Sequence, residues 1–278
     1  REGEPVTTAI DLACPTGTTM TPEQRVVFER DGYLVVPGAL GPAEVDRHAA
    51  ALRRLHAGAG ALHRLGAVSA CPTMLPLVDH PSVFGLVWSV LGWNIHLYHS
   101  HVDVHPPVPA DQADRFVWHQ DGGPQNRDLE TDPRPRLSVK VAFWLSDLSE
   151  PDRGNLEVLP GSHLDNRLSR PPTPEVPWPR PDGAVPILAQ PGDAILLDRR
   201  LWHARSTNRS TLTRRAAFFA YTYRWITARE HLTVDLPGLT PVQQQLLGTL
   251  PESDGDHAWA YQPEAVPLFR SLAELGHT

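Results

Sequence analysis

The first ninety residues show the apolar spacing of amphipathic helices, interrupted by one short strand. Thr21 is predicted as a helix N-cap, because its hydroxyl can accept a backbone N–H and a proline follows it in the first turn. Gly32 predicts the end of this helix, and residues 33–36 then form an apolar run of strand length. Periodic apolar positions predict further helices from residue 42 and over residues 80–91.

From residue 93 the pattern changes to short strands separated by turn residues. These strands are predicted over residues 95–104, 116–121, 137–145, 154–159, 194–198 and 216–223. Strands of this length, with proline and glycine in the turns, favour an antiparallel sandwich or barrel. Two proline-containing stretches, 122–136 and 169–186, are predicted as long loops, because proline disfavours helices and central strands. Short helices are expected over residues 241–247 and 263–275.

The pattern predicts one domain. Residues 1–19 lack periodicity and are expected to form a flexible N-terminal arm. Residues 20–278 are expected to form a single domain. Its β-core would span about 93–225, and a C-terminal helical extension would follow over 226–278.

Composition and charge exclude some classes of binding partner but say little about the chemistry. The net charge of −7 among 278 residues argues against nucleic acid and anionic membranes, which favour basic proteins. No apolar run approaches the length of a membrane span. Cys14 and Cys71 are the two cysteines; their wide separation suits a reducing cytoplasm and argues against structural zinc. A homodimer is left open.

Three side chains have the chemistry and spacing of an iron site. His119 and Asp121 are two residues apart after an extended segment, so both side chains can point to the same side. This pair alone is weak, because the chain contains 14 histidines. His203, which follows an apolar strand, is the best third ligand. Two histidines and one carboxylate with open positions are typical of non-heme Fe(II) oxygenases.

Arg214 adds a candidate binding residue for a second ligand. It opens the strand that ends at residue 223, eleven residues after His203. A guanidinium there can hold one carboxylate of a dicarboxylic acid through two hydrogen bonds.

In this order the motifs resemble the phytanoyl-CoA dioxygenase family of Fe(II)- and 2-oxoglutarate-dependent oxygenases. The resemblance covers roughly residues 20–225, and the helical tail is similar to that of actinobacterial members. The matching segments are Gly32-Tyr33-Leu34-Val35-Val36, Trp118-His119-Gln120-Asp121, Trp144-Leu145-Ser146-Asp147, Val158-Leu159-Pro160-Gly161-Ser162-His163 and Pro191-Gly192-Asp193, followed by His203, Asn208, Ser210 and Arg214.

The resemblance implies both a fold and an activity. The fold would be a double-stranded β-helix, the jelly roll of cupins, with an N-terminal helical layer and a C-terminal helical extension. His119, Asp121 and His203 would bind Fe(II), and Arg214 would bind the distal carboxylate of 2-oxoglutarate, with O₂ as the other cosubstrate. Related halogenases have a small residue at the position of Asp121, so the carboxylate here makes hydroxylation of a small molecule, such as a secondary metabolite, the expected outcome.

The chain departs from the family pattern around the cosubstrate. Arg205 stands where the family often has a small residue that helps to seat 2-oxoglutarate, and Ser206 follows it. His105 stands where a lysine is often found. Ser206 and His105 are therefore candidates for cosubstrate binding.

Lys140 is the single lysine among the 25 basic residues and lies in a predicted strand. Alternation places it on one face with Ser138, Ala142 and Trp144. Either this face is exposed to solvent, or the ammonium lies inside the barrel. A buried ammonium needs an anion, which could be a carboxylate of 2-oxoglutarate or of the substrate.

Several residues flank the predicted site and are candidates for substrate contact; equally, aromatic residues of this kind often belong to a core. They are His101, Phe116, Trp118 and Trp202. Alternatives to hydroxylation remain: the same cofactors can desaturate, epimerise or close rings. Two further alternatives are a metal-binding jelly-roll protein without oxygenase activity and a cupin-type isomerase, which would not need Arg214.

Overall fold

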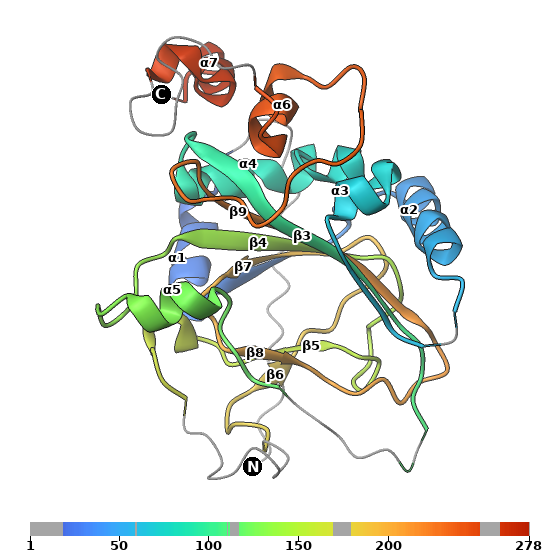
Figure 1. Ribbon diagram of the computed structural model, residues 1–278. Helices are drawn as coiled ribbons and strands as arrows, with labels where there is room; N and C mark the ends of the chain where they lie inside the picture. Colours follow the sequence, from blue (N-terminus) through green and yellow to red (C-terminus); the bar gives the residue numbers. More distant parts are fainter. Residues whose placement is uncertain are drawn as a thin grey trace.

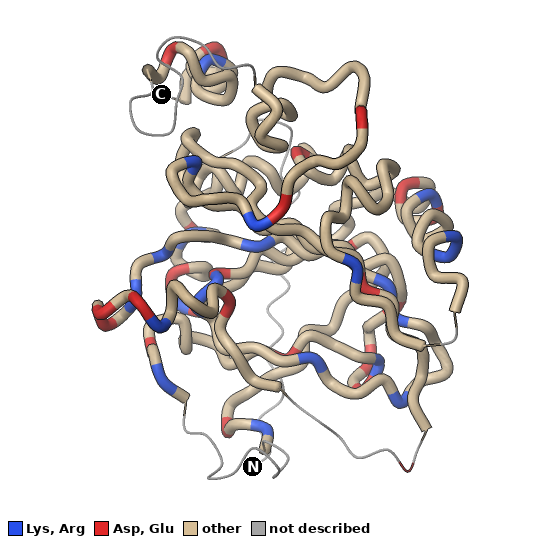
Figure 2. The backbone as a smooth tube through the Cα atoms, in the orientation of Figure 1, with Lys and Arg blue, Asp and Glu red and all other residues tan. Residues whose placement is uncertain are grey.

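The structure is a computed structural model that describes residues 19–58, 60–109, 111, 117–168, 179–250 and 262–277. The predicted N-terminal arm therefore lies almost entirely outside the described residues. No helix in the described part of the chain is long and apolar enough to cross a membrane. Basic and acidic residues are interspersed along the tube in Figure 2.

Two antiparallel sheets form the centre of the molecule (Figure 1). The six strands of the larger sheet are, in spatial order, β1 (Tyr33–Val36), β7 (Ala194–Asp198), β4 (Ser138–Trp144), β9 (Arg214–Tyr223), β3 (Ile95–His105) and β2 (Leu62–Leu65). The smaller sheet contains β6 (Val185–Pro186), β5 (Leu156–Val158) and β8 (His203–Arg205). The architecture is therefore mainly β, with helices, as the sequence predicted.

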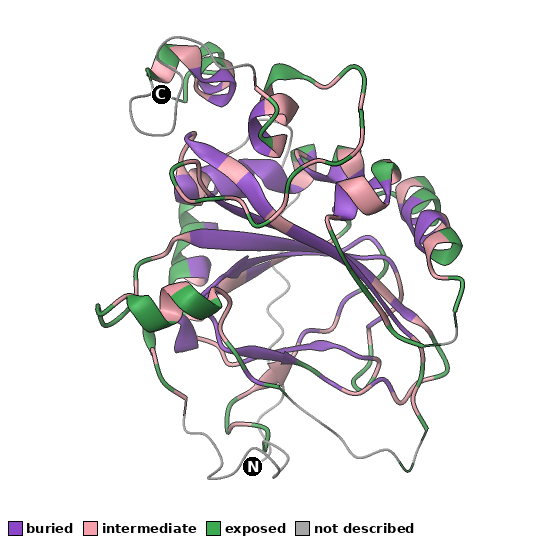
Figure 3. Ribbon diagram, in the orientation of Figure 1, coloured by how far each residue is buried: buried purple, intermediate pink, exposed green. Residues whose placement is uncertain are grey.

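Helices cover the larger sheet on the side away from the smaller one (Figures 1 and 3). The α-helices are α1 (Pro22–Asp31), α2 (Pro42–Leu55), α3 (Ala67–Ala70), α4 (Pro81–Leu91), α5 (Gly123–Asp128), α6 (Pro241–Leu247) and α7 (Pro267–Glu274). Three short 3₁₀ helices add η1 (Pro72–Leu77), η2 (Ser162–Leu164) and η3 (Pro263–Ala265). α4 lies against β4, β7 and β9, whereas α6 lies against β3.

The alternation of β4 divides the interior into two cores. Val139, Val141 and Phe143 belong to the core between the larger sheet and the helices. Ala142 and Trp144 belong to the core between the two sheets. Side chains two residues apart point to the same face, so the intersheet face of β4 is the face that also carries Lys140.

The predicted signals of the first helix are confirmed in detail. The Thr21 Oγ1 accepts the Gln24 N–H (3.1 Å), and the Gln24 Oε1 accepts the Thr21 N–H (2.8 Å), which forms a capping box. Gly32 ends α1 with φ of 82°, a left-handed conformation that glycine adopts without steric cost. Its hydrogens face His163, whose ring leaves no room for a Cβ.

Gln245 fastens the C-terminal helices to the sheet. This side chain on α6 is 1% exposed, and its amide donates to the backbone oxygens of Trp93 (2.9 Å) and Ile95 (3.0 Å). Its Oε1 accepts the Leu268 N–H of α7 (2.9 Å). Both helices therefore share one polar anchor beside β3.

The structure corrects three of the expected boundaries. Residues 122–136 were predicted as a loop but contain α5, in which a proline occupies the first turn, where it costs no hydrogen bond. Residues 169–186 were also predicted as a loop, yet Val185–Pro186 pairs with β5 as an edge strand, a position that tolerates proline. The strand predicted over residues 116–121 is reduced, among the described residues 117–121, to a single bridge at His119.

Candidate functional site

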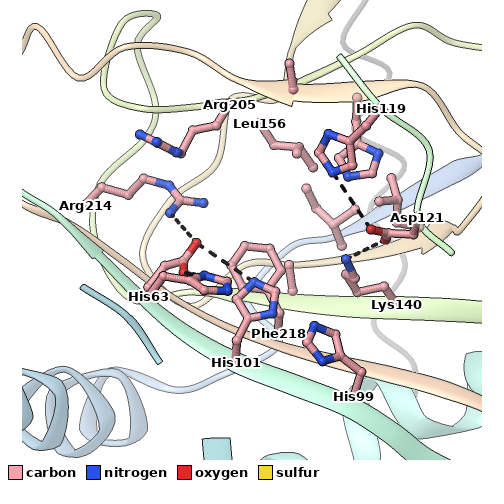
Figure 4. Close-up of a pocket in the computed structure, with 16 residues that line it drawn as sticks. His63, His99, His101, His119, Asp121, Lys140, Leu156, Arg205, Arg214 and Phe218 are labelled. Atoms are coloured by element: carbon pink, nitrogen blue, oxygen red, sulfur yellow. Dashed lines mark hydrogen bonds and ion pairs between the residues drawn. The ribbon is translucent and has the colours of Figure 1, made fainter. Parts of the chain in front are cut away.

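A pocket of about 280 Å³ lies between the two sheets. One wall comes from β2, β3, β4, β7 and β9 of the larger sheet. The facing wall comes from β5, β8 and the segment before α5 (Figure 4). Residues far apart in the sequence therefore meet in one cavity, which explains why single motifs could only suggest it.

His119, Asp121 and His203 lie together at one end of this pocket. One nitrogen or oxygen atom of each side chain lies within 4.8 Å of the others. Two backbone hydrogen bonds of 3.0 Å join His119 to His203, and their ring centroids are 4.3 Å apart. The Asp121 N–H donates to the Arg199 carbonyl (2.8 Å). The fold thus brings together the three side chains that the sequence identified.

Both imidazoles are oriented by backbone carbonyls. The Nδ1 of His119 lies 2.9 Å from the Val117 oxygen, and the Nδ1 of His203 lies 2.8 Å from the Leu201 oxygen. A proton on each Nδ1 leaves the Nε2 lone pair free, the tautomer that a metal ligand needs. Burial, assisted by His119, lowers the pKa of His203 to about 3, so its ring is neutral. Two oriented imidazoles and one carboxylate fit Fe(II).

Lys140 lies inside the pocket and not in solvent. It is 8% exposed, and its Nζ lies 2.5 Å from the Asp121 Oδ2. Burial opposes the charge of Asp121, but Lys140 and the two histidines hold the pKa of this carboxyl well below its usual range. The inward alternative is therefore correct, and its anion in this structure is the carboxylate of a candidate ligand.

Arg214 lies on the opposite side of the pocket from Asp121 (Figure 4). The residue is 2% exposed, and its guanidinium lies 5.1 Å from the ring of Trp144 and 3.5 Å from the Asp103 Oδ2. Its buried Nε has no hydrogen-bond partner among the described residues. Burial lowers the pKa of Arg214 to about 10, and Asp103 offsets part of this shift, so the side chain remains cationic at neutral pH.

The position of Arg214 depends on a glycine. Gly154 has φ of 76°, and a Cβ at this position would lie 2.9 Å from the Arg214 Cδ. Glycine here therefore leaves space for the arginine stem. A buried cation with an unused donor fits the distal carboxylate of 2-oxoglutarate.

Strands β2 and β3 contribute a polar wall of His63, His99, His101 and Asp103. Burial lowers the pKa of His99 to about 4 and that of His101 to about 3, so both rings are neutral at physiological pH. His101 stacks on Phe218 with 4.4 Å between ring centroids. His63, His101 and Asp103 also have the spacing of a metal site, but the Arg214 cation beside Asp103 disfavours a second metal there.

Four other candidates from the sequence, Trp118, Trp202, Ser206 and His105, do not line the pocket. Trp118 and Trp202 belong to a separate apolar cluster, because Trp118 points to the opposite side from its neighbour His119. Ser206 donates its N–H to the Asn155 oxygen (2.9 Å) and does not line the pocket. His105 lies 3.5 Å from Asp103 and is not among the residues that line the pocket. Phe116 lies outside the described residues.

Among the ionisable side chains that line the pocket, His63 and Arg205 were not assigned to it from the sequence. His63 belongs to β2, which is mostly exposed and has no apolar alternation. Arg205 was considered as a departure from the family pattern and was not assigned to the pocket. Alternation from His203 along β8 could have placed it on the pocket face.

The chain is similar to proteins of known activity. It is 33% identical over 118 residues to dioxygenase andF of Emericella variicolor, a match that covers 41% of this chain and 39% of that protein. The chain thus spans about two fifths of the length of that relative. It is 24% identical over 239 residues to the ectoine dioxygenase of Nocardia farcinica, which covers 72% of this chain and 76% of the relative.

A solved structure has the same fold, and a family model matches most of the chain. The crystal structure of the epimerase SnoN, in complex with Fe³⁺, alpha-ketoglutarate and nogalamycin RO, aligns with a TM-score of 0.56 and 24% identity. The alignment covers 77% of this chain and 89% of SnoN. Residues 28–216 match the family described as phytanoyl-CoA dioxygenase (PhyH). Because this match spans more than half of the chain, the protein belongs to the phytanoyl-CoA dioxygenase family.

Proposed function

We propose that the protein is an Fe(II)- and 2-oxoglutarate-dependent oxygenase that hydroxylates a small molecule, a secondary metabolite being the favoured class. The observation that carries this proposal is the convergence of His119, Asp121 and His203 within 4.8 Å in a pocket that also contains the buried cation of Arg214. Membership of the family supports the same activity. A metal-binding protein without oxygenase activity, or a cupin-type isomerase, would have no use for Arg214.

The side chains of the chain have separate tasks. His119, Asp121 and His203 hold the iron on one side, which leaves its other positions for ligands. Arg214 holds the distal carboxylate of 2-oxoglutarate. When bound, iron and 2-oxoglutarate supply the oxidation of a C–H bond by O₂, with release of succinate and CO₂. The pocket walls exclude water and hold the substrate in one orientation.

Lys140 is proposed to bind the other end of the cosubstrate. A metal ion that binds Asp121 would withdraw charge from the carboxylate that now faces the ammonium. The buried Lys140 would then need another anion, and the carboxylate beside the keto group of 2-oxoglutarate lies on the metal side of this ligand. His105 is less suited to this task, because its imidazole contacts Asp103.

The outcome of the oxidation depends on which substrate atom faces the iron. Asp121 stands where related halogenases have a small residue, and this carboxylate favours hydroxylation over chlorination. Epimerisation is a second candidate, because the similar structure of SnoN is that of an epimerase. Desaturation and ring formation would use the same residues. Of the predicted substrate contacts, His101 lines the pocket.

The wider expectations remain predictions. The two facing antiparallel sheets support the double-stranded β-helix and its helical extensions. The domain limits, the cytoplasmic location and a homodimer also stay predictions. Interspersed charges support the expectation that nucleic acid is not a partner (Figure 2).

Succinate formation tests the activity. With Fe(II), ascorbate, O₂ and 2-oxoglutarate, the protein should convert 2-oxoglutarate to succinate, and candidate small molecules that bind should accelerate this conversion. His203→Ala should abolish it, because two ligands hold iron poorly. If succinate formation by the wild-type protein equals that of His203→Ala with every candidate, the oxygenase assignment is wrong.

A further inference from the structure

Arg205 places a second guanidinium beside Arg214. β8 carries His203 and Arg205 two residues apart, so both side chains point to the pocket. In Figure 4 the guanidinium groups of Arg205 and Arg214 lie next to each other at one end of the cavity. The Arg205 side chain has no hydrogen bond or ion pair with the part of the chain that the structure describes, whereas its backbone pairs with Leu156 of β5.

Asp103 is the acidic neighbour of these two arginines. β3 pairs with β9 so that His105 is opposite Arg214, which places Asp103 and Arg214 diagonally on the same face. The Oδ2 of Asp103 lies 3.5 Å from Arg214, and its Oδ1 lies 2.7 Å from the Nδ1 of His63. Burial opposes ionisation, but His105, His63 and Arg214 hold the pKa of Asp103 well below its usual range. The carboxyl is therefore ionised.

The charges of Arg205, Arg214 and Asp103 do not cancel. Two guanidinium groups and one carboxylate give the cluster a net charge of +1. Without Arg205, the remaining Asp103–Arg214 pair would be neutral, and Asp103 would repel an incoming carboxylate at short range. The positive charge that attracts an anion to this end of the pocket therefore depends on Arg205.

We propose that Arg205 and Arg214 together bind the distal carboxylate of 2-oxoglutarate, with Asp103 as a built-in counter-ion that sets the net charge of the anchor. The proposal rests on the proposed function, because it assumes this cosubstrate. It goes beyond that function because it assigns cosubstrate binding to Arg205 and an opposing effect on that binding to Asp103. Asp103 competes with the cosubstrate for Arg214, and Arg205 compensates for this competition.

A double-mutant cycle tests the proposal by cosubstrate binding alone, without a substrate. Anaerobic Fe(II)-loaded protein is titrated with 2-oxoglutarate at pH 8, and the visible charge-transfer band reports binding. Arg205→Ser should raise the Kd at least tenfold. Asp103→Asn in addition should restore the Kd to within about threefold of the wild-type value, because the cluster regains its net positive charge.

Two controls separate an anchor from a general structural effect. Arg209→Ser removes an arginine of the same segment whose side chain donates to the Pro109 oxygen outside the pocket lining, and it should leave the Kd unchanged. 2-Oxobutyrate lacks a distal carboxylate. Its Kd should therefore be the same for the wild-type protein and Arg205→Ser, and the Fe(II) affinity of both proteins should also be equal.

The failures are distinguishable. If the wild-type protein gives no band with 2-oxoglutarate, the proposed function itself fails. If the wild-type protein gives the band but Arg205→Ser binds 2-oxoglutarate as tightly as Arg209→Ser does, the two-arginine anchor is wrong. A double variant that binds no better than Arg205→Ser would remove the role of Asp103 as counter-ion and overturn the proposal.

Discussion

At the scale of single residues, most buried charges in the pocket are neutralised by a side chain of opposite charge within it. Lys140 faces Asp121, and Asp103 faces Arg214, so these four buried side chains already have internal partners. Such pairs keep buried charges compensated when the pocket contains no ligand. A bound metal ion would then replace Lys140 as the partner of Asp121, and the cosubstrate carboxylate would replace Asp103 as the partner of Arg214.

Lys140→Met tests whether Lys140 binds 2-oxoglutarate when a metal ion occupies Asp121. The Kd for 2-oxoglutarate should rise about tenfold, because one charge-assisted hydrogen bond is worth roughly 1.5–3 kcal/mol. The Fe(II) affinity should not fall, since Asp121 loses a competitor. Anaerobic titrations measure both constants, and Lys140→Arg serves as the charge-preserving control. Equal cosubstrate affinity of Lys140→Met and the wild-type protein would contradict the role proposed for Lys140.

A buried histidine away from the pocket predicts how stability varies with pH. His48 on α2 is fully buried, and neither ring nitrogen has a hydrogen-bond partner in the described part of the chain. Burial lowers its pKa to about 4. The unfolded chain takes up this proton near pH 6.5, before the folded protein does. Stability should therefore fall as the pH decreases from 6.5 to 4, with a slope from this group of up to about 1.4 kcal/mol per pH unit.

His48→Leu measures the contribution of that histidine. Urea unfolding at several pH values should show a smaller loss of stability for the variant than for the wild-type protein between pH 6.5 and 4. Parallel curves for the two proteins would show that His48 titrates normally in the folded state.

At the scale of elements, regular strands were predictable and short ones were not. β1, β3, β4, β7 and β9 have apolar or alternating sequences and were located to within two residues. β2 is mostly exposed, and β6 and β8 contain two and three residues, too few for a periodic signal. Alternation correctly grouped the side chains of β4. It could not tell that both faces are buried, because the burial of the Lys140 face depends on the second sheet.

α5 supports a candidate ligand through the backbone: the Asn126 Nδ2 donates to the Asp121 backbone oxygen (2.8 Å). The Arg199 guanidinium, 1% exposed as a residue, donates to the Asp121 backbone oxygen (3.2 Å). It also donates to the side-chain oxygens of Gln125 (3.2 Å) and Asn126 (3.1 Å) on α5. One buried cation therefore fixes the helix and the backbone of a candidate ligand.

Arg199→Leu should weaken Fe(II) binding about tenfold, the usual cost of losing a residue that orients a ligand. Arg127→Leu is the matched control. Arg127 lies on α5, and its exposed side chain pairs with Asp128. Metal titrations compare the variants, and circular dichroism verifies their folding. If both variants bind Fe(II) equally well, Arg199 does not position Asp121.

At the scale of the whole molecule, the site joins parts of the fold that the sequence keeps apart. His119 and Asp121 precede α5, His203 lies on β8, and Arg214 begins β9 on the other sheet. The sequence could predict these four through ligand chemistry. It could not predict the contacts of Asp103 with Arg214 and His63, which arise from the strand register of the larger sheet.

Metal binding should therefore stabilise the folded chain as a unit. Fe(II) at one hundred times its Kd should add about 2.7 kcal/mol to the free energy of unfolding, because the unfolded chain does not hold the three ligands together. Anaerobic thermal unfolding measures this effect. His203→Ala should lose it, and an equal stabilisation of the variant would place the metal elsewhere.

The most direct measurement of the central claim is the visible spectrum of the protein under anaerobic conditions. Fe(II) and 2-oxoglutarate together should produce a weak charge-transfer band in the wild-type protein, since the cosubstrate chelates an iron held by His119, Asp121 and His203. Neither component alone should produce it, and His203→Ala should lack it. A wild-type protein without the band, or a His203→Ala variant that retains it in full, would contradict the account.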